Sequence, residues 1–218
     1  FRWSTGSYLV CRLLLEKKGI ERDVYLYSQP KVAIKDFRVT STLDDTYKNG
    51  IFKLTMDIRN TGSQTSKDYI IRYKVFDPKT NKVIAESEKN SAFNANSTIS
   101  LFGHTEIEIP DVKTWTSEHP NLYKLLMYIK DGEKIVEMVP FNIGFRRIEI
   151  KPIEQKAANG QPYVCLFING QPLKLKGVNI HEHNPSTGHY VTEDLMRRDL
   201  ELMKHCLLYT SPSPRDRG

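Results

Sequence analysis

The chain has 218 residues, of which 39% are hydrophobic and 27% are charged, a balance typical of a globular protein. No run approaches the roughly 18 consecutive apolar residues of a membrane-spanning helix, so we expect no membrane partner. The net charge is +6, but the basic residues are spread along the chain and form no aromatic-basic platform. We therefore expect no nucleic-acid partner either.

The start of the chain and its cysteines say little about the compartment. The chain begins "FRWSTGSYL", without Met and without a signal-peptide pattern, and we predict an internal fragment of a longer protein. The choice between cytoplasm and periplasm stays open. The three widely spaced cysteines form neither a disulfide framework nor a CxxC zinc pair. We expect buried free thiols at Cys11, Cys165 and Cys206.

The first two predicted sections of the chain consist of strands. Residues 1–29 end in "VYLYSQP", whose alternation predicts a strand that Pro30 terminates. In "NGIFKLTMDIRNTG" every second residue is apolar, and Asp131-Gly132 between two similar runs is a strong hairpin signal. Residues 30–147 hold roughly seven such strands in about 115 residues, which predicts an immunoglobulin-like β-sandwich.

The third section, residues 148–205, changes from strands to a helix. "GFRRIEIKP" and "PYVCLFINGQPLKLKGVN" predict strands, with Asn169-Gly170 at the tip of a turn. Thr192 is a suitable N-cap for the helix that follows. One face of this helix carries Met196, Leu200 and Met203. Strand, loop and helix form one βα unit, and we expect the rest of its sheet to lie downstream.

A loop rich in histidine follows the predicted strand at 173–179. It contains His181, His183 and His189 within nine residues. Their spacing matches no known zinc-ligand pattern and there is no HExxH, so we expect no metal site here. From the pattern alone, these histidines are either ordinary surface side chains or groups that hydrogen-bond a ligand.

Residues 206–218, "CLLYTSPSPRDRG", do not continue the helix, because Pro212 and Pro214 forbid it. The string resembles a translated sequencing adapter. We expect it to be an artefactual tail outside the fold, with a natural disordered tail as the alternative.

Six strings occur in order between residue 2 and residue 204: "RWSTGSYL", "GIERDVYLYSQP", "WTSEHPNLYKL", "FNIGFRRIEI", "NGQPLKLKGVNIHEHNPSTGH" and "RRDLELMK". Together they resemble glycoside hydrolase family two, and within it the large β-galactosidases. The resemblance implies a mainly β chain in three parts. Residues 1–29 would be the C-terminal strands of a sugar-binding jelly-roll domain, residues 30–147 the immunoglobulin-like sandwich, and residues 148–205 the first βα unit of a catalytic (β/α)8 TIM barrel.

The resemblance also implies a role for the histidine loop. Barrel enzymes carry their active sites in the loops after the strands. His181 would hydrogen-bond a sugar hydroxyl and stabilise the oxocarbenium-like transition state. Asn179, Glu182 and His183 would bind substrate or orient the loop. Thr5 would also bind substrate, at a position where the family usually has an aspartate that helps to bind sodium and the sugar's 6-hydroxyl.

The implied activity is that of a bacterial retaining β-galactosidase acting on terminal β-D-galactosyl residues of lactose-type substrates. Such enzymes need two carboxylates about 5–5.5 Å apart, and in this family both are glutamates on later barrel strands. We therefore expect this chain by itself to be inactive. The resemblance implies no cofactor within the chain, Mg²⁺ and Na⁺ in the full-length parent, and a homo-oligomeric parent.

Two alternatives remain at this point. A β-glucuronidase or β-mannosidase of the same family shares the sandwich and the "GVNxHE" type of motif, although "RWSTGSYL" and "NPSTGHY" favour a galactosidase. A non-catalytic, immunoglobulin-like carbohydrate-binding module is the other alternative. Such a module has no need of an amphipathic helix after a histidine loop, which favours the enzyme.

Overall fold

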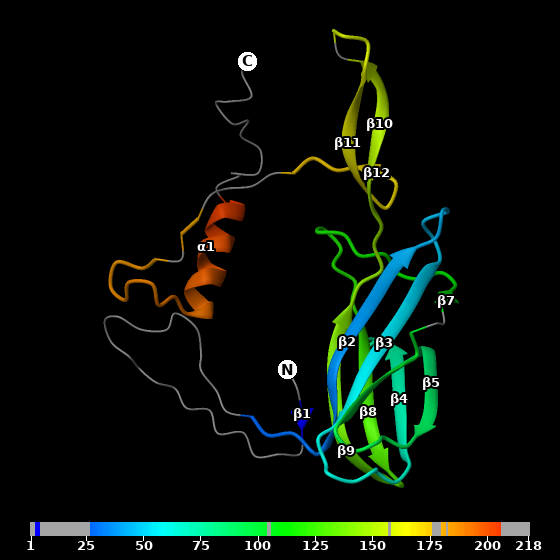
Figure 1. The fold of residues 1–218 in the computed structure, drawn as a ribbon. Coiled ribbons are helices and arrows are strands. Elements are labelled where there is room, and N and C mark those ends of the chain that lie inside the picture. Colours follow the sequence, from blue (N-terminus) through cyan, green and yellow to red (C-terminus); the bar gives the residue numbers. More distant parts are fainter. Residues whose placement is uncertain are drawn as a thin grey trace. The chain divides into compact units, whose positions relative to one another are not determined.

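The computed structural model describes residues 3–4, 27–103, 106–156, 158–175, 180–181 and 183–205. The chain divides into two compact units. The first comprises Phe1–Leu9 and Leu26–Pro172, and the second comprises Val10–Tyr25 and Leu173–Gly218. The first unit is built from strands, whereas the second contributes one helix among the described residues (Figure 1).

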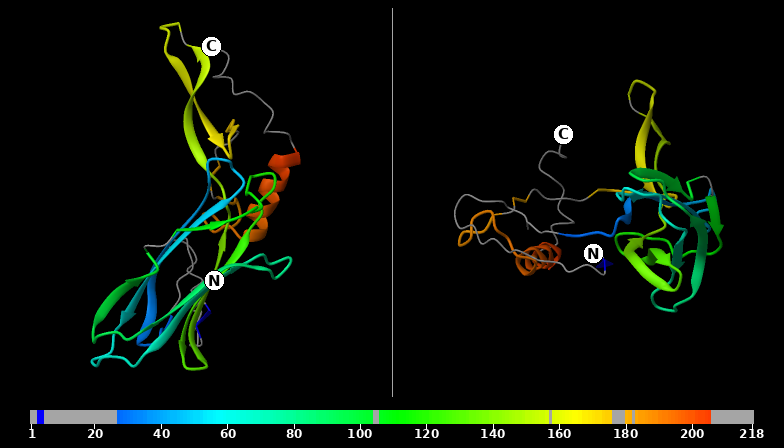
Figure 2. Two further views of the ribbon diagram at one scale, coloured as in Figure 1. Left: turned by 90° about the vertical axis from the view of Figure 1, so that its right-hand side faces the viewer. Right: turned by 60° about the horizontal axis from the view of Figure 1, so that its bottom comes forward.

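Two antiparallel sheets lie face to face in the first unit (Figures 1 and 2). One sheet has the order β1-β9-β8-β4-β5, and the other has the order β2-β3-β6, with β7 also paired to β3. Their bounds are β1 Trp3–Ser4, β2 Val32–Leu43, β3 Gly50–Asn60, β4 Tyr69–Phe76, β5 Val83–Ser91, β6 Ser97–Leu101, β7 Glu106–Ile109, β8 Tyr123–Asp131 and β9 Lys134–Ile143. This is the predicted sandwich.

The observed pairings follow the local signals in the sequence. The tight turn at Asp131-Gly132 joins β8 to β9, with Asp131 opposite Lys134 and Gly132 at a φ of 58°. Two short strands pair with β3 on the side away from β2. β6 pairs with Met56–Asn60 and β7 pairs with Gly50–Lys53. The described residues between 30 and 147 therefore form eight strands, one more than the roughly seven expected.

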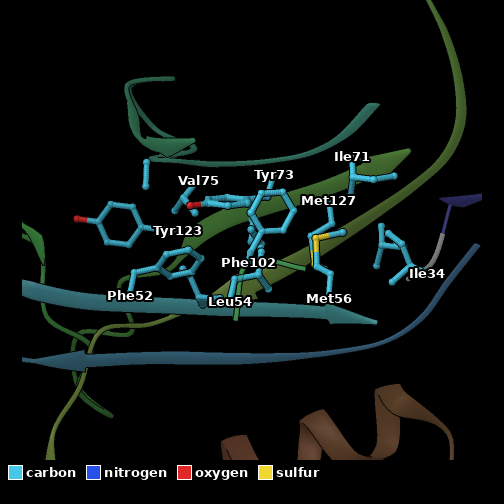
Figure 3. Close-up of a cluster of buried hydrophobic side chains, with 14 of the residues drawn as sticks. Ile34, Phe52, Leu54, Met56, Ile71, Tyr73, Val75, Phe102, Tyr123 and Met127 are labelled. Carbon is cyan, nitrogen blue, oxygen red and sulfur yellow. The ribbon is translucent and has the colours of Figure 1, made fainter. Parts of the chain in front are cut away.

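The core lies between the two sheets, because each strand turns alternate side chains inward. The apolar face of β3 is buried as its period predicts: Phe52, Leu54, Met56 and Ile58 are at most 2% exposed. Figure 3 shows this face of β3 packed against side chains from β4 and β8. The ring of Tyr73 contacts Phe102 edge-on at 5.1 Å and Phe52 at 5.7 Å.

A buried carboxylate connects β9 to the start of β2 and to the segment before it. Glu137 of β9 is fully buried and accepts hydrogen bonds from Ile34 N at 2.6 Å and from Gln29 Nε2 at 3.1 Å. β1 pairs with β9 beside it, with Ser4 opposite Glu137. The strand expected at "VYLY" and the remaining jelly-roll strands fall largely outside the described residues, and the jelly-roll domain stays a prediction.

The predicted strands after the sandwich form a separate three-stranded sheet of β10 Ile148–Lys156, β11 Pro162–Ile168 and β12 Gln171–Pro172. The strand predicted over 173–179 is not observed at Leu173–Leu175, and residues 176–179 lie outside the described part. A barrel strand takes hydrogen bonds from two neighbouring strands. The described residues supply no such neighbours, so the alternating pattern alone does not produce a strand there. Cys165 of β11 is a free, half-buried thiol, whereas Cys11 and Cys206 are outside the described residues.

The second unit contains helix α1, Glu193–His205. Thr192 is its N-cap, as predicted, because Leu195 N donates to Thr192 Oγ1 at 3.4 Å. The expected apolar stripe is only partly covered among the described residues: Met196 and Met203 are half-buried, whereas Leu200 is 60% exposed. Within the described residues no helix has the length and apolarity needed to cross a membrane.

Candidate functional site

The predicted site residues divide into two groups. Thr5, Asn179 and Glu182 lie outside the described residues, so their expected contacts with substrate stay predictions. His181 and His183 are described, and both are exposed to solvent. His183 N donates to the carbonyl of His181 at 2.8 Å.

The histidine loop is closed by a short turn. Asn184 N donates to Gly188 O and Gly188 N donates to Asn184 O, both at 2.8 Å. The side chain of Asn184 also accepts from Ser186 N at 2.8 Å, and Gly188 takes a positive φ of 67° that few other residues adopt readily. The sequence "NPSTG" therefore forms its own local structure, which carries exposed imidazoles on either side.

The implied metal ions have no donor set in this part of the chain. Within the described residues, no three His, Cys, Asp or Glu side chains gather into one group. Mg²⁺ takes oxygen ligands in near-octahedral geometry, and the loop offers imidazole nitrogens instead. We assign no step of a reaction to Mg²⁺ or Na⁺ through these residues.

A contact here called the joint attaches β10–β12 to the sandwich. Its first component is the turn between β11 and β12, where Asn169 and Gly170 have φ angles of 48° and 76°. Asn169 N donates to Arg147 O at 2.8 Å, and its Oδ1 accepts from Arg147 N at 2.9 Å. Its Nδ2 donates to Trp115 O at 3.1 Å. One asparagine thus connects the turn to two separate segments of backbone.

The second component of the joint is a charged network around Tyr47. The Tyr47 hydroxyl donates to Glu149 at 2.7 Å and accepts from Lys151 at 2.9 Å. Lys151 and Arg147 each form an ion pair with Glu149, at 3.0 and 3.1 Å. A side chain at Gly170 would lie 2.7 Å from the Tyr47 ring, so only glycine permits this approach. β10 and the β2–β3 loop are thereby held together.

Trp115 forms the third component. Its backbone N donates to Phe145 O at 2.8 Å, and the guanidinium of Arg146 lies 4.7 Å from its ring centroid. The ring also covers Gly144, where an added Cβ would meet it at 3.0 Å. The strings "WTSEHPNLY", "FNIGFRR" and "INGQP" therefore converge on one place in the structure.

The network lowers the pKa of Glu149 below its ordinary value, first through the hydrogen bond from Tyr47 and then through that from Lys151. A depressed pKa means that the folded state binds this proton less well than the unfolded state. The stabilisation is therefore present above the ordinary glutamate range and is lost as pH falls through the folded pKa. We expect the Tm difference between the wild type and Glu149→Gln to narrow as pH is lowered from about 7 to about 3.

Glu154→Gln is the matched control for this pH series, because Glu154 lies on the same strand but is exposed. A pH-dependent Tm difference of the same size in both variants would mean that the effect is not specific to the joint. A Tm difference for Glu149→Gln that stays constant over the range would mean that the Glu149 carboxylate does not stabilise the joint.

The sequence alone indicated only part of this arrangement. It placed Asn169-Gly170 at a turn, but gave no sign that the turn contacts the sandwich. Tyr47 went unnoticed, because its partner Glu149 lies 102 positions away in the chain. A tyrosine at a positive φ of 59° in the turn after β2 is a structural feature with no local sequence signal.

Comparison with known proteins identifies this arrangement. The family model described as "Glycosyl hydrolases family 2" matches residues 32–146, which include the whole sandwich from β2 to β9. The model described as "Glycosyl hydrolases family 2, TIM barrel domain" matches residues 164–208, which include the histidine loop and α1. The sandwich and the histidine loop thus fall within the two matched models of this family. The chain belongs to glycosyl hydrolases family 2, with the sandwich and the start of the TIM barrel domain.

Curated relatives agree with this family. The chain is 34% identical over 204 residues to a beta-galactosidase of Photobacterium profundum and 35% identical over 207 residues to one of Priestia megaterium. These matches cover 93% and 94% of the chain but only 18% and 19% of the relatives. The chain therefore spans about a fifth of the length of the relatives it matches.

Solved structures share the fold at lower identity. A beta-glucuronidase of Bacteroides uniformis matches with a TM-score of 0.71 and 20% identity, over 85% of this chain and 22% of that one. A beta-glucuronidase of Parabacteroides merdae matches with a TM-score of 0.63 and 24% identity, over 83% of this chain and 20% of that one. At this identity the likeness concerns the fold alone.

Proposed function

We propose that this chain is part of a retaining β-galactosidase that hydrolyses terminal β-D-galactosyl residues. The observation that carries the proposal is the 30–35% identity to proteins named beta-galactosidase, over 93–94% of the chain. That similarity includes both the sandwich and the histidine loop. The solved beta-glucuronidases are less similar in sequence, at 20–24% identity, and carry no comparable argument for a glucuronide substrate.

His181 is the substrate-contacting group in this proposal. Its imidazole is exposed and can hydrogen-bond a sugar hydroxyl, and such a bond becomes stronger as positive charge develops on the sugar ring. His183 orients the loop. Thr5, Asn179 and Glu182 complete the proposed substrate contacts.

The chain by itself is proposed to be inactive. Retention requires an acid/base and a nucleophile, two carboxylates about 5–5.5 Å apart. Glu193 is engaged at the start of α1, where it forms an ion pair with Arg197 at 3.0 Å. The proposal places both catalytic glutamates, and the ligands of Mg²⁺, in the part of the barrel domain that follows residue 205. It also includes a homo-oligomeric full-length enzyme.

The test compares chromogenic β-galactoside, β-glucuronide and β-mannoside, assayed with this chain and with the full-length enzyme encoded by its gene. We expect the full-length enzyme to cleave the β-galactoside fastest, and this chain to stay at the buffer blank. Faster cleavage of the β-glucuronide or β-mannoside would overturn the substrate assignment. Turnover by this chain well above the blank would show that the catalytic carboxylates lie within it.

A further inference from the structure

The turn in the histidine loop places two imidazoles next to each other. Asn184 and Gly188 form an isolated antiparallel bridge, closed by two backbone hydrogen bonds of 2.8 Å. The next pair outward is His183 and His189, a non-hydrogen-bonded pair, and in such pairs side chains on one face lie closest together. Their ring centroids are 5.4 Å apart, with an interplanar angle of 84°.

This spacing allows the two rings to share a metal ion, although edge-to-face ring pairs without a metal also have it. A zinc–nitrogen bond of about 2.0–2.1 Å places each imidazole centroid about 3.2 Å from the metal. If the angle at the metal between the two ligands is tetrahedral, the two centroids are about 5.2 Å apart. If that angle is about 90°, they are about 4.5 Å apart. The observed 5.4 Å agrees with tetrahedral coordination.

The surroundings leave both imidazoles available. His183 and His189 are exposed, and among the described residues neither ring has a hydrogen-bond partner. The turn does not depend on them, because it is held by its backbone and by the side chain of Asn184. Two nitrogen ligands without a carboxylate favour borderline transition metals over Mg²⁺ or Ca²⁺.

We propose that His183 and His189 together chelate one Zn²⁺ ion, with water in its remaining coordination positions. The proposal is independent of the glycosidase assignment. It replaces the expectation, drawn from the histidine spacing, that this loop binds no metal. The spacing itself gave no sign of a site, because the turn brings the two histidines together. The rival explanation is an edge-to-face pair of imidazoles that binds no metal, and the experiment separates the two.

The experiment titrates the 218-residue chain with zinc sulfate by isothermal calorimetry, alongside four single variants. We expect one equivalent of Zn²⁺ to bind. His183→Ala and His189→Ala should each weaken binding by at least about 100-fold, because each removes one arm of a bidentate site. His181→Ala and His119→Ala should leave the affinity unchanged, since neither ring belongs to the pair.

The folding of each variant is checked by far-UV circular dichroism, and zinc-dependent shifts of the imidazole NMR signals give a second readout. The signals of His183 and His189 should shift together at one equivalent. The proposal is overturned if no equivalent binds, if binding survives both His183→Ala and His189→Ala, or if His119→Ala weakens it equally.

Discussion

Phe145→Ala is expected to lower the free energy of unfolding of the sandwich by about 3–5 kcal/mol, which urea denaturation followed by circular dichroism would measure. The Phe145 ring is fully buried and contacts Tyr123 edge-on at 5.4 Å. It also fills the space above Gly50, where an added Cβ would lie 2.7 Å from the ring. Because a glycine backbone has no side chain that can move into the vacated volume, the cavity should persist.

Phe141→Ala is the matched control. Phe141 lies at the end of β9, is 45% exposed, and makes one edge-on ring contact with Phe37 at 5.2 Å. Its loss should cost only about 1 kcal/mol. Equal losses for the two variants would show that the space around Phe145 collapses, and that the close approach of Gly50 does not keep it open.

Asn169→Asp is expected to release the β10–β12 sheet from the sandwich while leaving the sandwich folded. The substitution keeps the oxygen that accepts from Arg147 N and, like Asn, Asp tolerates the positive φ of this turn. It removes the donor to Trp115 O and places a carboxylate oxygen against that carbonyl. The Trp115 carbonyl is part-buried, and the loss of its donor should cost about 1 kcal/mol. Amides of Ile148–Pro172 should therefore exchange with solvent about 5-fold faster.

Hydrogen exchange measured by mass spectrometry tests this expectation, with peptides from β3 as the internal reference. Asn159→Asp is the control, because Asn159 also precedes a glycine, in the turn between β10 and β11. Its side chain only accepts a hydrogen bond, from Gln161 N at 3.1 Å, and aspartate can do the same. If Asn169→Asp exchanges no faster than Asn159→Asp, the Trp115 contact does not hold the joint.

Phe145→Ala and Asn169→Asp change residues of two of the three sequence strings that meet at the joint. The resemblance of these strings to the family implied nothing about their physical role in the fold. The contacts of Trp115, Phe145 and Asn169 explain that role, because they fix where the chain leaves the sandwich before it enters the barrel domain. The sugar-binding role proposed for the histidine loop involves the part of the chain that follows this attachment.

The prediction of strands succeeded where the signal is local. The period-two pattern of β3 predicted its buried face, and Asp131-Gly132 predicted the β8–β9 hairpin. Thr192 was likewise predictable as an N-cap from its position before the helix. The prediction of a strand over 173–179 was wrong at Leu173–Leu175. A barrel strand depends on hydrogen bonds to neighbouring strands, which the alternating sequence pattern does not supply.

Local signals specify the sandwich, the helix and the family, since alternation, turn residues and motifs are properties of short stretches of chain. Tertiary packing decides the joint, and the turn between Asn184 and Gly188 decides the imidazole pair. Tyr47 and Glu149 are 102 positions apart, and Asn169 and Trp115 are 54 apart, so their contacts depend on how distant segments pack. His183 and His189 are close in sequence, but only the hydrogen bonds across the Asn184–Gly188 turn bring their rings together.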